Sequence, residues 1–235
     1  MDFNSEKLAI AIQARMSSQR FPGKVLMPFL GSNIIGHLVN NLKYLNLPIY
    51  VLTSQEDSDL PLVDYLIQNR VPYYRGSLRS LVHRYHSFMQ ETGFQYVIRI
   101  SGDSPLFHPS LIQFCLEAAS ETDNFDLVSN VFPRTFPSGQ SIELFSRELT
   151  ASILKLSDDS EHLEHVTPYV YTNANKFNIV NFQNPFIKPL PKMSLDLPSE
   201  LSTLETIGGH LLRENLYKAS WLSAAKSIHS LTLSV

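Results

Sequence analysis

The chain has 235 residues, of which 43% are hydrophobic and 17% charged, a length and composition that favour one large α/β domain and exclude a disordered chain. Its 19 basic and 22 acidic residues give a net charge of −3, which excludes the broadly basic surface of a protein that binds nucleic acid or an anionic membrane. The single cysteine, Cys115, excludes a disulfide framework and, with no apolar run near the roughly 20 residues that span a bilayer, indicates a cytoplasmic protein.

Short apolar runs alternate with longer amphipathic runs along the first half of the chain. This alternation predicts strand and helix units around a mostly parallel sheet. The expected strands are residues 8–14, 49–53, 71–74 and 96–101. The expected helices are residues 34–45, 59–69, 78–91 and a fourth that Pro109 opens. Ser58 or Asp59 stands near the start of the second of these helices, and Cys115 lies on the apolar face of the fourth.

The second half of the chain is less regular. We expect two further strands, at 126–130 and 142–145. Three further helices are expected at 147–156, 161–175 and about 199–218. A kink or restart is expected at Pro168, and Ser199 is the expected cap of the last, C-terminal helix. The proline-containing segments 131–139 and 184–192 are expected to be ordered loops.

A basic segment, residues 15–24, follows the first expected strand directly. It contains Arg15, Arg20 and Lys24 and no acid, although the chain as a whole is negative. Ligands of parallel sheets bind beyond the carboxyl ends of the strands, where these cations and the Ser18 hydroxyl can hold a polyphosphate. The segment lacks the glycines of a P-loop or of a dinucleotide fingerprint. A solvated basic loop is the alternative, and charge alone favours neither interpretation.

Two aspartates are candidates for holding Mg²⁺. Asp103 stands in a Gly-Asp turn directly after the strand 96–101, and Asp196 ends a short apolar run before Pro198. Mg²⁺ usually takes one or two carboxylates together with phosphate oxygens, so the two aspartates could share a cation. Taken singly, they fit a turn cap and a helix cap better. Arg99, inside the strand, either points to the ligand or pairs with a neighbouring acid.

An ordered set of motifs resembles the cytidylyltransferase family that includes the spore coat polysaccharide biosynthesis type and the enzymes that make CMP-activated sugar acids. The motifs are AIQARMSSQRFPGKVL, TSQEDSD, YYRGS, RISGDSPLFHP, VSN followed by PRTFPSG, EHVTPYVY and SLDLPSEL. They run from about Leu8 to about Ile207. The resemblance implies a Rossmann-like three-layer α/β sandwich of the nucleotide-diphospho-sugar transferase type, with a mostly parallel mixed sheet.

The resemblance also implies an activity: Mg²⁺-dependent transfer of CMP from CTP to the hydroxyl of a sugar or sugar acid, with release of pyrophosphate, for surface polysaccharide or glycan biosynthesis. By position it assigns four residues to the triphosphate and two to the metal, namely Arg15, Ser18, Arg20 and Lys24, and Asp103 and Asp196. Lys24 and Asp103 are the expected catalytic residues. The charge pattern singles out the same side chains.

The remaining motifs are expected to form the acceptor site. The residues that match the family's sugar-facing part are Asn130, Arg134, Glu143, His165 and Thr167. An arginine is a natural partner for a sugar carboxylate. A single domain over residues 1–235 is expected, with a nucleotide-binding part over about 1–125 and a sugar-binding and dimer-contact part over about 126–200. The resemblance implies a homodimer.

Two departures from the family pattern leave alternatives open. Leu78, Arg79 and Ser80 stand where relatives carry acids, and Ser141 replaces an Asp in a Gly-x-Asp-x-Glu pattern. If that Asp contacts the acceptor, the protein uses a different sugar or is impaired. The alternatives are therefore a nucleotidyltransferase of the same fold that uses another nucleoside triphosphate, and a catalytically impaired nucleotide-binding partner protein.

Overall fold

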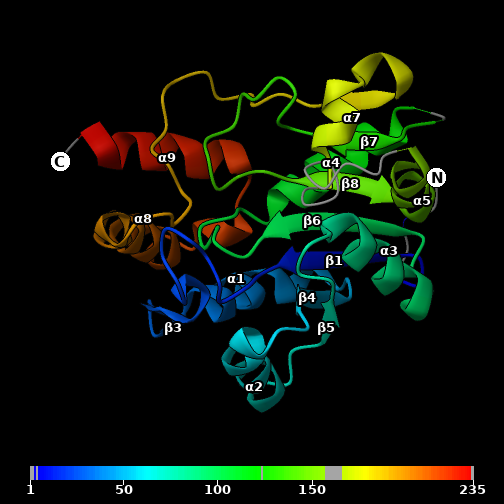
Figure 1. Ribbon diagram of the computed structural model, residues 1–235. Coiled ribbons are helices and arrows are strands. Elements are labelled where there is room, and N and C mark those ends of the chain that lie inside the picture. The colour runs from blue at the N-terminus through cyan, green and yellow to red at the C-terminus, as the bar shows by residue number, and fades with distance from the viewer. Residues whose placement is uncertain (1–2, 4, 123, 157–165, 234–235) are drawn as a thin grey trace.

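The computed structural model describes residues 3, 5–122, 124–156 and 166–233 (Figure 1). Its main sheet contains β1 (Leu8–Gln13), β4 (Ile49–Ser54), β5 (Tyr73–Gly76), β6 (Tyr96–Ser101), β7 (Leu127–Ser129), β8 (Glu143–Ser146) and β9 (Ile179–Asn181). The strand order is β5-β4-β1-β6-β8-β7-β9. The first four strands of that order are parallel, whereas β8 runs antiparallel to both of its neighbours. The sheet is therefore mixed and mostly parallel.

Helices cover both faces of this sheet (Figure 1). One apolar core joins the sheet to α1 (Ile34–Leu42), α2 (Leu60–Gln68), α4 (Ser110–Ser120), α8 (Leu201–Arg213) and α9 (Trp221–Leu233). A second core joins the opposite face to α3 (Leu81–Thr92), α5 (Arg147–Leu156) and α7 (Pro168–Thr172). Leu8, Ile10 and Ile12 of β1 face the first core, and Ala9 and Ala11 face the second. A strand buried on both faces needs such a continuous apolar run.

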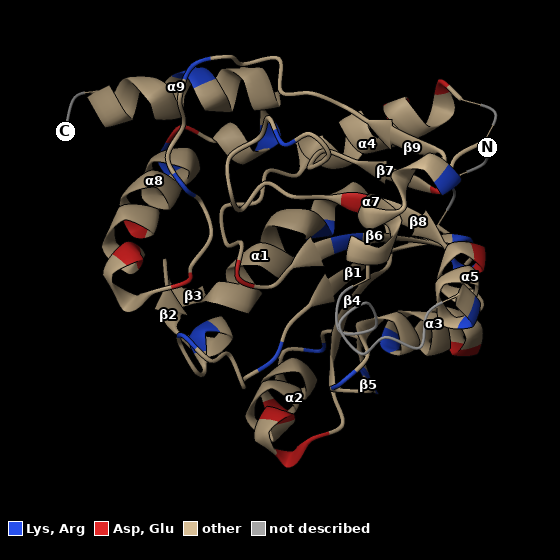
Figure 2. Ribbon diagram, turned by 45° about the horizontal axis from the view of Figure 1, so that its top comes forward, with Lys and Arg blue, Asp and Glu red and all other residues tan. Residues whose placement is uncertain are grey.

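Shorter elements connect these layers. They are the hairpin of β2 (Pro28–Phe29) and β3 (Ser32–Asn33) and the 3-10 helices η1 (Lys24–Leu26), η2 (Lys43–Leu45), η3 (Asp57–Asp59), η4 (Ala174–Lys176), η5 (Pro198–Glu200) and η6 (Leu216–Lys218). Figure 2 shows most of the sheet free of charged residues, with the charges on surrounding helices and loops. Within the described residues, the helices are too short or too polar to cross a membrane.

The three-layer fold confirms the fold class that the sequence predicts. Cys115 is buried in α4, as its place on an apolar face predicts. Helix α7 begins at Pro168, in agreement with a restart there, whereas residues 161–165 of the expected helix lie outside the described residues. The segments 131–139 and 184–192 contain no helix or longer strand and are ordered loops.

The C-terminal region differs from the expectation. The helix predicted over about 199–218 is interrupted, because α8 ends at Arg213 and Asn215 adopts a left-handed conformation with φ 53°. A further helix, α9, follows it and was not predicted. The predicted cap Ser199 is wrong: it lies within η5, where the Glu200 carboxylate accepts hydrogen bonds from the Asp196 and Leu197 N–H groups. The strand β9 and the hairpin β2–β3 were also not predicted.

Candidate active site

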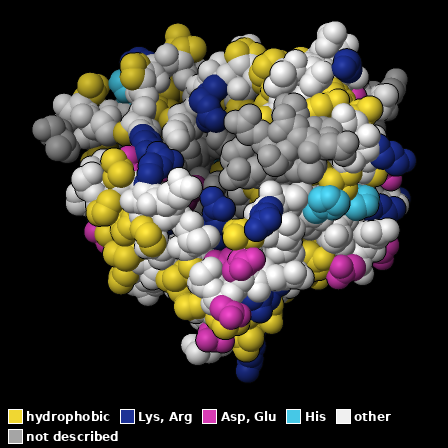
Figure 3. Space-filling model, in the orientation of Figure 1, with side chains coloured by type: hydrophobic (Ala, Val, Ile, Leu, Met, Phe, Trp, Pro, Cys, Tyr) yellow, Lys and Arg dark blue, Asp and Glu magenta, His cyan; other side chains and the backbone are white. Residues whose placement is uncertain are grey.

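The basic segment forms a closed loop at the carboxyl end of β1. The Gly23 N–H donates to the Met16 carbonyl at 2.8 Å, and Gly23 adopts φ 74°, which a glycine accommodates without strain. This closure returns the chain to the end of the strand, where η1 begins with Lys24. All four residues assigned to the triphosphate, Arg15, Ser18, Arg20 and Lys24, consequently line one pocket of about 270 Å³. Basic side chains gather in the middle of the face seen in Figure 3.

The Gly-Asp turn after β6 lies against the end of β1. The Gly102 N–H donates to the Gln13 carbonyl at 2.7 Å, and a Cβ at Gly102 would lie 2.8 Å from the Cβ of Ala14. Only a glycine permits this approach. It brings Asp103 into the basic pocket, where Asp103 Oδ2 lies 2.6 Å from Lys24 Nζ.

Asp196 reaches the same ammonium group from the late loop. Lys24 Nζ donates to the Leu195 carbonyl at 2.7 Å and lies 3.6 Å from Asp196 Oδ1. Arg20 contacts the same oxygen at 2.8 Å, and Lys192 contacts Asp196 Oδ2 at 2.6 Å. Partial burial raises the pKa of Asp196, but the Lys192 hydrogen bond and the charges of Lys24, Lys192 and Arg20 outweigh it and hold the pKa below its usual value.

These contacts bear on the alternatives that the sequence left open. Lys24 is only 6% exposed and is not part of a solvated basic segment, whereas Arg15 and Arg20 are exposed. The helix-cap interpretation of Asp196 is wrong, because its carboxylate contacts three cations and Glu200 provides the capping oxygen. The structure brings Asp103 and Asp196 together on one Nζ atom, that of Lys24.

The donor set fits Mg²⁺. Two aspartates at a basic pocket supply the oxygen ligands that Mg²⁺ takes alongside phosphate oxygens. Among the described residues, no group of three or more His, Cys, Asp or Glu side chains is arranged to hold a metal ion. A metal at Asp103 and Asp196 would therefore depend on ligand atoms supplied by a bound nucleotide.

Two residues predicted for the acceptor site meet in a buried network. Glu143 Oε1 accepts hydrogen bonds from Thr167 Oγ1 at 2.7 Å and from Tyr171 Oη at 2.6 Å. Its other oxygen pairs with Arg99, so Arg99 is the partner of a neighbouring acid. Burial and the Glu143 charge raise the pKa of Tyr171. Because Arg99 Nε also donates to Gln13 Oε1 at 3.1 Å, this network extends to the wall of the basic pocket.

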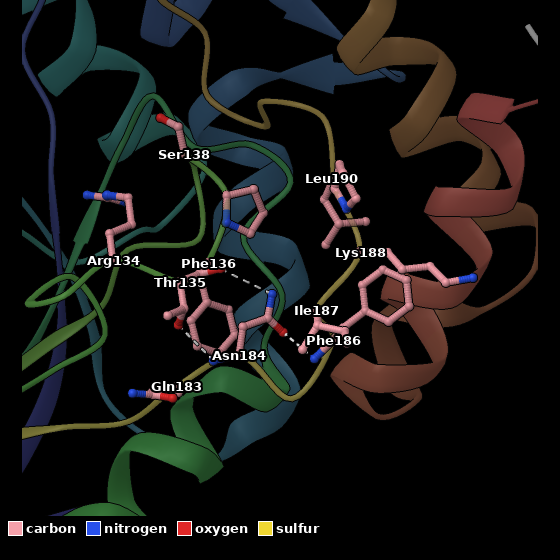
Figure 4. A pocket seen from close by; sticks show the side chains of 12 residues that line it. Arg134, Thr135, Phe136, Ser138, Gln183, Asn184, Phe186, Ile187, Lys188 and Leu190 are labelled. Carbon is pink, nitrogen blue, oxygen red and sulfur yellow. Dashed lines mark hydrogen bonds between the residues drawn. The ribbon is translucent and has the colours of Figure 1, made fainter.

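The remaining predicted acceptor residues are separated. Asn130 is fully buried and binds the backbone of residues 140–142 through both ends of its amide. Arg134 is exposed, donates to Ser141 Oγ at 2.8 Å and lines a second pocket of about 640 Å³. Figure 4 shows this second pocket between the loops 134–138 and 183–190. His165 lies outside the described residues.

A short irregular segment, residues 193–196, is hydrogen-bonded to one residue of each pocket. The Met193 N–H donates to the Ser138 carbonyl at 2.7 Å, and the Leu195 N–H donates to the Asp103 carbonyl at 2.8 Å. Gly139 lies directly under this segment with φ 93°, and a Cβ there would lie 2.6 Å from Ser194 N. Gly139 is therefore required for the path that carries Asp196 to Lys24.

Two residues beside Asp196 were not identified from the sequence. Lys192 Nζ bridges Asp196 and Glu200, at 2.6 Å from each carboxylate. The spacing of four residues from Lys192 to Asp196 was the available signal. It was weak, because the segment is not helical and its side-chain directions follow from loop contacts.

Comparison with known proteins identifies the fold and the family. The fold matches solved nucleotidyltransferases, and this protein is a nucleotidyltransferase. The model of the family described as Cytidylyltransferase matches residues 9–219. The chain therefore belongs to the cytidylyltransferase family, which confirms the resemblance of its motifs.

Three known proteins show how far the similarity extends. A cytidylyltransferase structure from Leptospira borgpetersenii serovar Hardjo-bovis has a TM-score of 0.88 and 27% identity, and the match covers 96% of this chain and 95% of that one. The spore coat polysaccharide biosynthesis protein SpsF of Bacillus subtilis is 26% identical over 207 residues, which are 83% of this chain and 84% of that protein. A CMP:2-keto-3-deoxy-manno-octonic acid synthetase complexed with CTP has a TM-score of 0.66 at 15% identity, covers 87% and 99% of the two chains, and supports the fold alone.

Proposed function

We propose that this protein transfers the CMP group of CTP to a hydroxyl group of a sugar or sugar acid and releases pyrophosphate. The convergence of Asp103 and Asp196 on Lys24 Nζ, at the basic pocket of a cytidylyltransferase fold, carries this proposal. The similarity to a spore coat polysaccharide biosynthesis protein supports a product used for surface polysaccharide or glycan synthesis.

The pocket side chains would act mainly by positioning and charge stabilisation. In the proposed reaction the acceptor hydroxyl releases its proton to water, and its oxygen bonds to the α-phosphorus while the bond from that phosphorus to the pyrophosphate oxygen breaks. Arg15, Arg20 and Lys24 supply positive charge and Ser18 a hydroxyl donor for the phosphates. Such preorganised cations stabilise the charge that develops on leaving pyrophosphate.

Asp103 and Asp196 would hold Mg²⁺. When bound, Mg²⁺ would add positive charge at the phosphates and help to orient them. The Ser101 hydroxyl donates to Asp103 Oδ1 at 2.7 Å, which fixes that carboxylate. Lys192 contacts Asp196 Oδ2, the oxygen that Arg20 and Lys24 do not contact.

We place the acceptor beside Arg134, whose guanidinium suits a sugar carboxylate. Within the described residues, Arg134 pairs with no acidic side chain. Its partner there is the neutral hydroxyl of Ser141. Asn130, Glu143 and Thr167 are buried, so they would shape the acceptor site from behind. The assignment of His165 to this site stays a prediction.

We further propose that the enzyme is a cytoplasmic homodimer. The loops of the predicted dimer-contact part expose Phe132 at 41% and Ile187 at 96%, and apolar side chains of this kind are often covered by a partner. The single buried thiol of Cys115 suits a reducing compartment. Light scattering coupled to size-exclusion chromatography should give the mass of two chains, and a mass of one chain would contradict the dimer.

The direct test of the activity is pyrophosphate release from each of the four nucleoside triphosphates with Mg²⁺ and a panel of sugar acids. We expect release with CTP and an acceptor. Release with a different triphosphate would support the alternative nucleotidyltransferase. CTP binding without release, with any acceptor, would indicate an impaired nucleotide-binding protein.

A further inference from the structure

Asp59 is a fully buried carboxylate outside the pocket, and its oxygens accept four hydrogen bonds. Thr53 Oγ1 donates to Oδ2 at 2.9 Å, and the Ser54 N–H and Oγ donate to the same oxygen at 3.0 and 2.5 Å. The Met16 N–H donates to Oδ1 at 2.6 Å. Asp59 thus joins the carboxyl end of β4 to the basic loop after β1.

The Met16 contact reaches the binding residues directly. Met16 follows Arg15 in the chain, and its carbonyl accepts the Gly23 N–H that closes the loop before Lys24. Met16 is therefore the residue at which both ends of the basic loop meet. Its N–H is held by Asp59, a residue of another element, which fixes the whole loop relative to the sheet.

The turn that carries Asp59 is itself held by the next strand. Arg75 of β5 donates from Nε to the Ser54 carbonyl at 3.0 Å and from Nη2 to the Glu56 carbonyl at 3.1 Å. A buried guanidinium, Arg84, adds an opposite charge: its own burial lowers its pKa, and the charge of Asp59 raises it. The TSQEDSD and YYRGS motifs thereby support one carboxylate.

The carboxylate of Asp59 remains ionised in this setting. Burial raises its pKa, but the hydrogen bonds from Ser54, Met16 and Thr53 outweigh burial and lower the pKa overall. An ionised acceptor makes stronger hydrogen bonds than a neutral one. The contact with Met16 is therefore a strong one.

Helix capping does not account for this residue. Asp59 occupies the N-cap position of α2, as its place near the helix start predicts, but its side chain makes no capping hydrogen bond. A carboxylate buried only to begin a helix would cost free energy without a compensating contact. Its contacts are instead made with the end of β4 and with the basic loop.

We propose that Asp59 is a positioning residue for the triphosphate, which acts through the Met16 N–H to hold Arg15, Ser18 and Lys24 in their binding arrangement. This inference rests on the proposed binding of a nucleoside triphosphate in the basic pocket. It assigns to Asp59 no contact with the substrate. Preorganisation of this kind lowers the ordering cost of binding.

The test is the affinity of Asp59→Asn for CTP and for inorganic tripolyphosphate with Mg²⁺, measured by titration calorimetry. Asn has nearly the same shape, but it replaces one charged acceptor oxygen by an NH₂ group and removes the charge. The loss of this charge-assisted contact should raise Kd roughly 10–100-fold at unchanged stoichiometry. In steady-state assays KM for CTP should rise, while kcat at saturating CTP should fall less than about threefold.

A matched control separates positioning from stability. Trp221→Phe removes another buried hydrogen bond, from Trp221 Nε1 to Asn184 Oδ1 at 2.7 Å, and Trp221 does not line the basic pocket. It should lower stability and leave Kd unchanged. A stoichiometry that falls at constant Kd in Asp59→Asn, or an equal rise of Kd in Trp221→Phe, would overturn the proposal.

A second variant keeps the test decisive if Asp59→Asn does not fold. Arg75→Met removes the two hydrogen bonds that hold the Asp59 turn and leaves the carboxylate in place. It should raise both Kd values several-fold, and unchanged values would overturn the proposal. If the wild type binds tripolyphosphate but not CTP, the proposed use of CTP is wrong. The Kd values for tripolyphosphate then still test the positioning role of Asp59.

Discussion

Lys24 and Asp103 form an ion pair, with 2.6 Å between Nζ and Oδ2, although 79 residues separate them in the sequence. The pair joins the loop after β1 to the turn after β6, two strands that are hydrogen-bonded neighbours. Parallel neighbours end at the same edge of the sheet, which explains why these two loops meet. The pair therefore marks the centre of the candidate active site.

Replacing Lys24 should weaken nucleotide use. Lys24→Met removes a nearly buried ammonium that would bind phosphate oxygens, a contact of about 1.5–3 kcal/mol, so KM for CTP should rise roughly 10–100-fold. Lys226→Met is the matched control, since Lys226 is exposed on α9 and lines neither pocket. It should leave KM within about twofold of the wild type. Equal KM values for Lys24→Met and the wild type would remove Lys24 from the site.

Gly139 should be intolerant of a side chain. Gly139→Ala combines an unfavourable φ of 93° with a collision against the Met193–Ser194 backbone, so we expect a loss of at least about 2 kcal/mol of unfolding free energy and a higher KM for CTP. Gly93→Ala is the control, because Gly93 has φ 83° but open space around it. It should cost only about 1 kcal/mol and leave KM unchanged. Urea denaturation and steady-state assays would measure both effects, and similar results for the two variants would contradict this account.

His37 should make stability depend on pH. Burial lowers its pKa from 6.5 to about 4, and its Nε2 lies 3.0 Å from Asn41 Nδ2 and 3.1 Å from Tyr217 Oη. Below pH 6.5 the unfolded chain binds a proton that the folded chain does not. Stability should therefore fall by about 3 kcal/mol between pH 6.5 and pH 4 because of this residue.

The variant His37→Gln isolates that contribution from the carboxylates that titrate in the same range. The unfolding free energy of the wild type, relative to that of the variant, should fall as the pH falls from 7 to 4. Chemical denaturation at several pH values measures it. A difference that is constant over this range would show that His37 does not cause the dependence.

The sequence predicted the parts of the structure that depend on periodicity and strand ends. The sequence indicated that Arg15, Lys24 and Asp103 share one edge of a sheet, because of the apolar run of β1, the basic loop and the Gly-Asp turn. In the structure all three residues line one pocket. Helix α9 carried a readable signal that was missed, because Trp221, Ala224, Ala225 and Ile228 follow helical spacing.

Other features depend on contacts that a sequence does not display. The bridge from Lys192 to Asp196 and Glu200 arises in an irregular segment, where no periodicity sets side-chain directions. Asp59 stands where a helix cap is expected, and only the tertiary structure directs its carboxylate to Met16. Glu143 matches a substrate residue by motif, yet its oxygens are occupied by Arg99, Thr167 and Tyr171.

The most direct test of the account is the identity of the products formed from CTP and a sugar-acid acceptor with Mg²⁺, followed by ³¹P NMR and mass spectrometry. The account predicts pyrophosphate and a CMP-acceptor conjugate in equal amounts. It also predicts that Asp103→Asn, which removes a charge from the centre of the site, folds normally and forms neither product. Pyrophosphate without a conjugate, or full conjugate formation by Asp103→Asn, would contradict it.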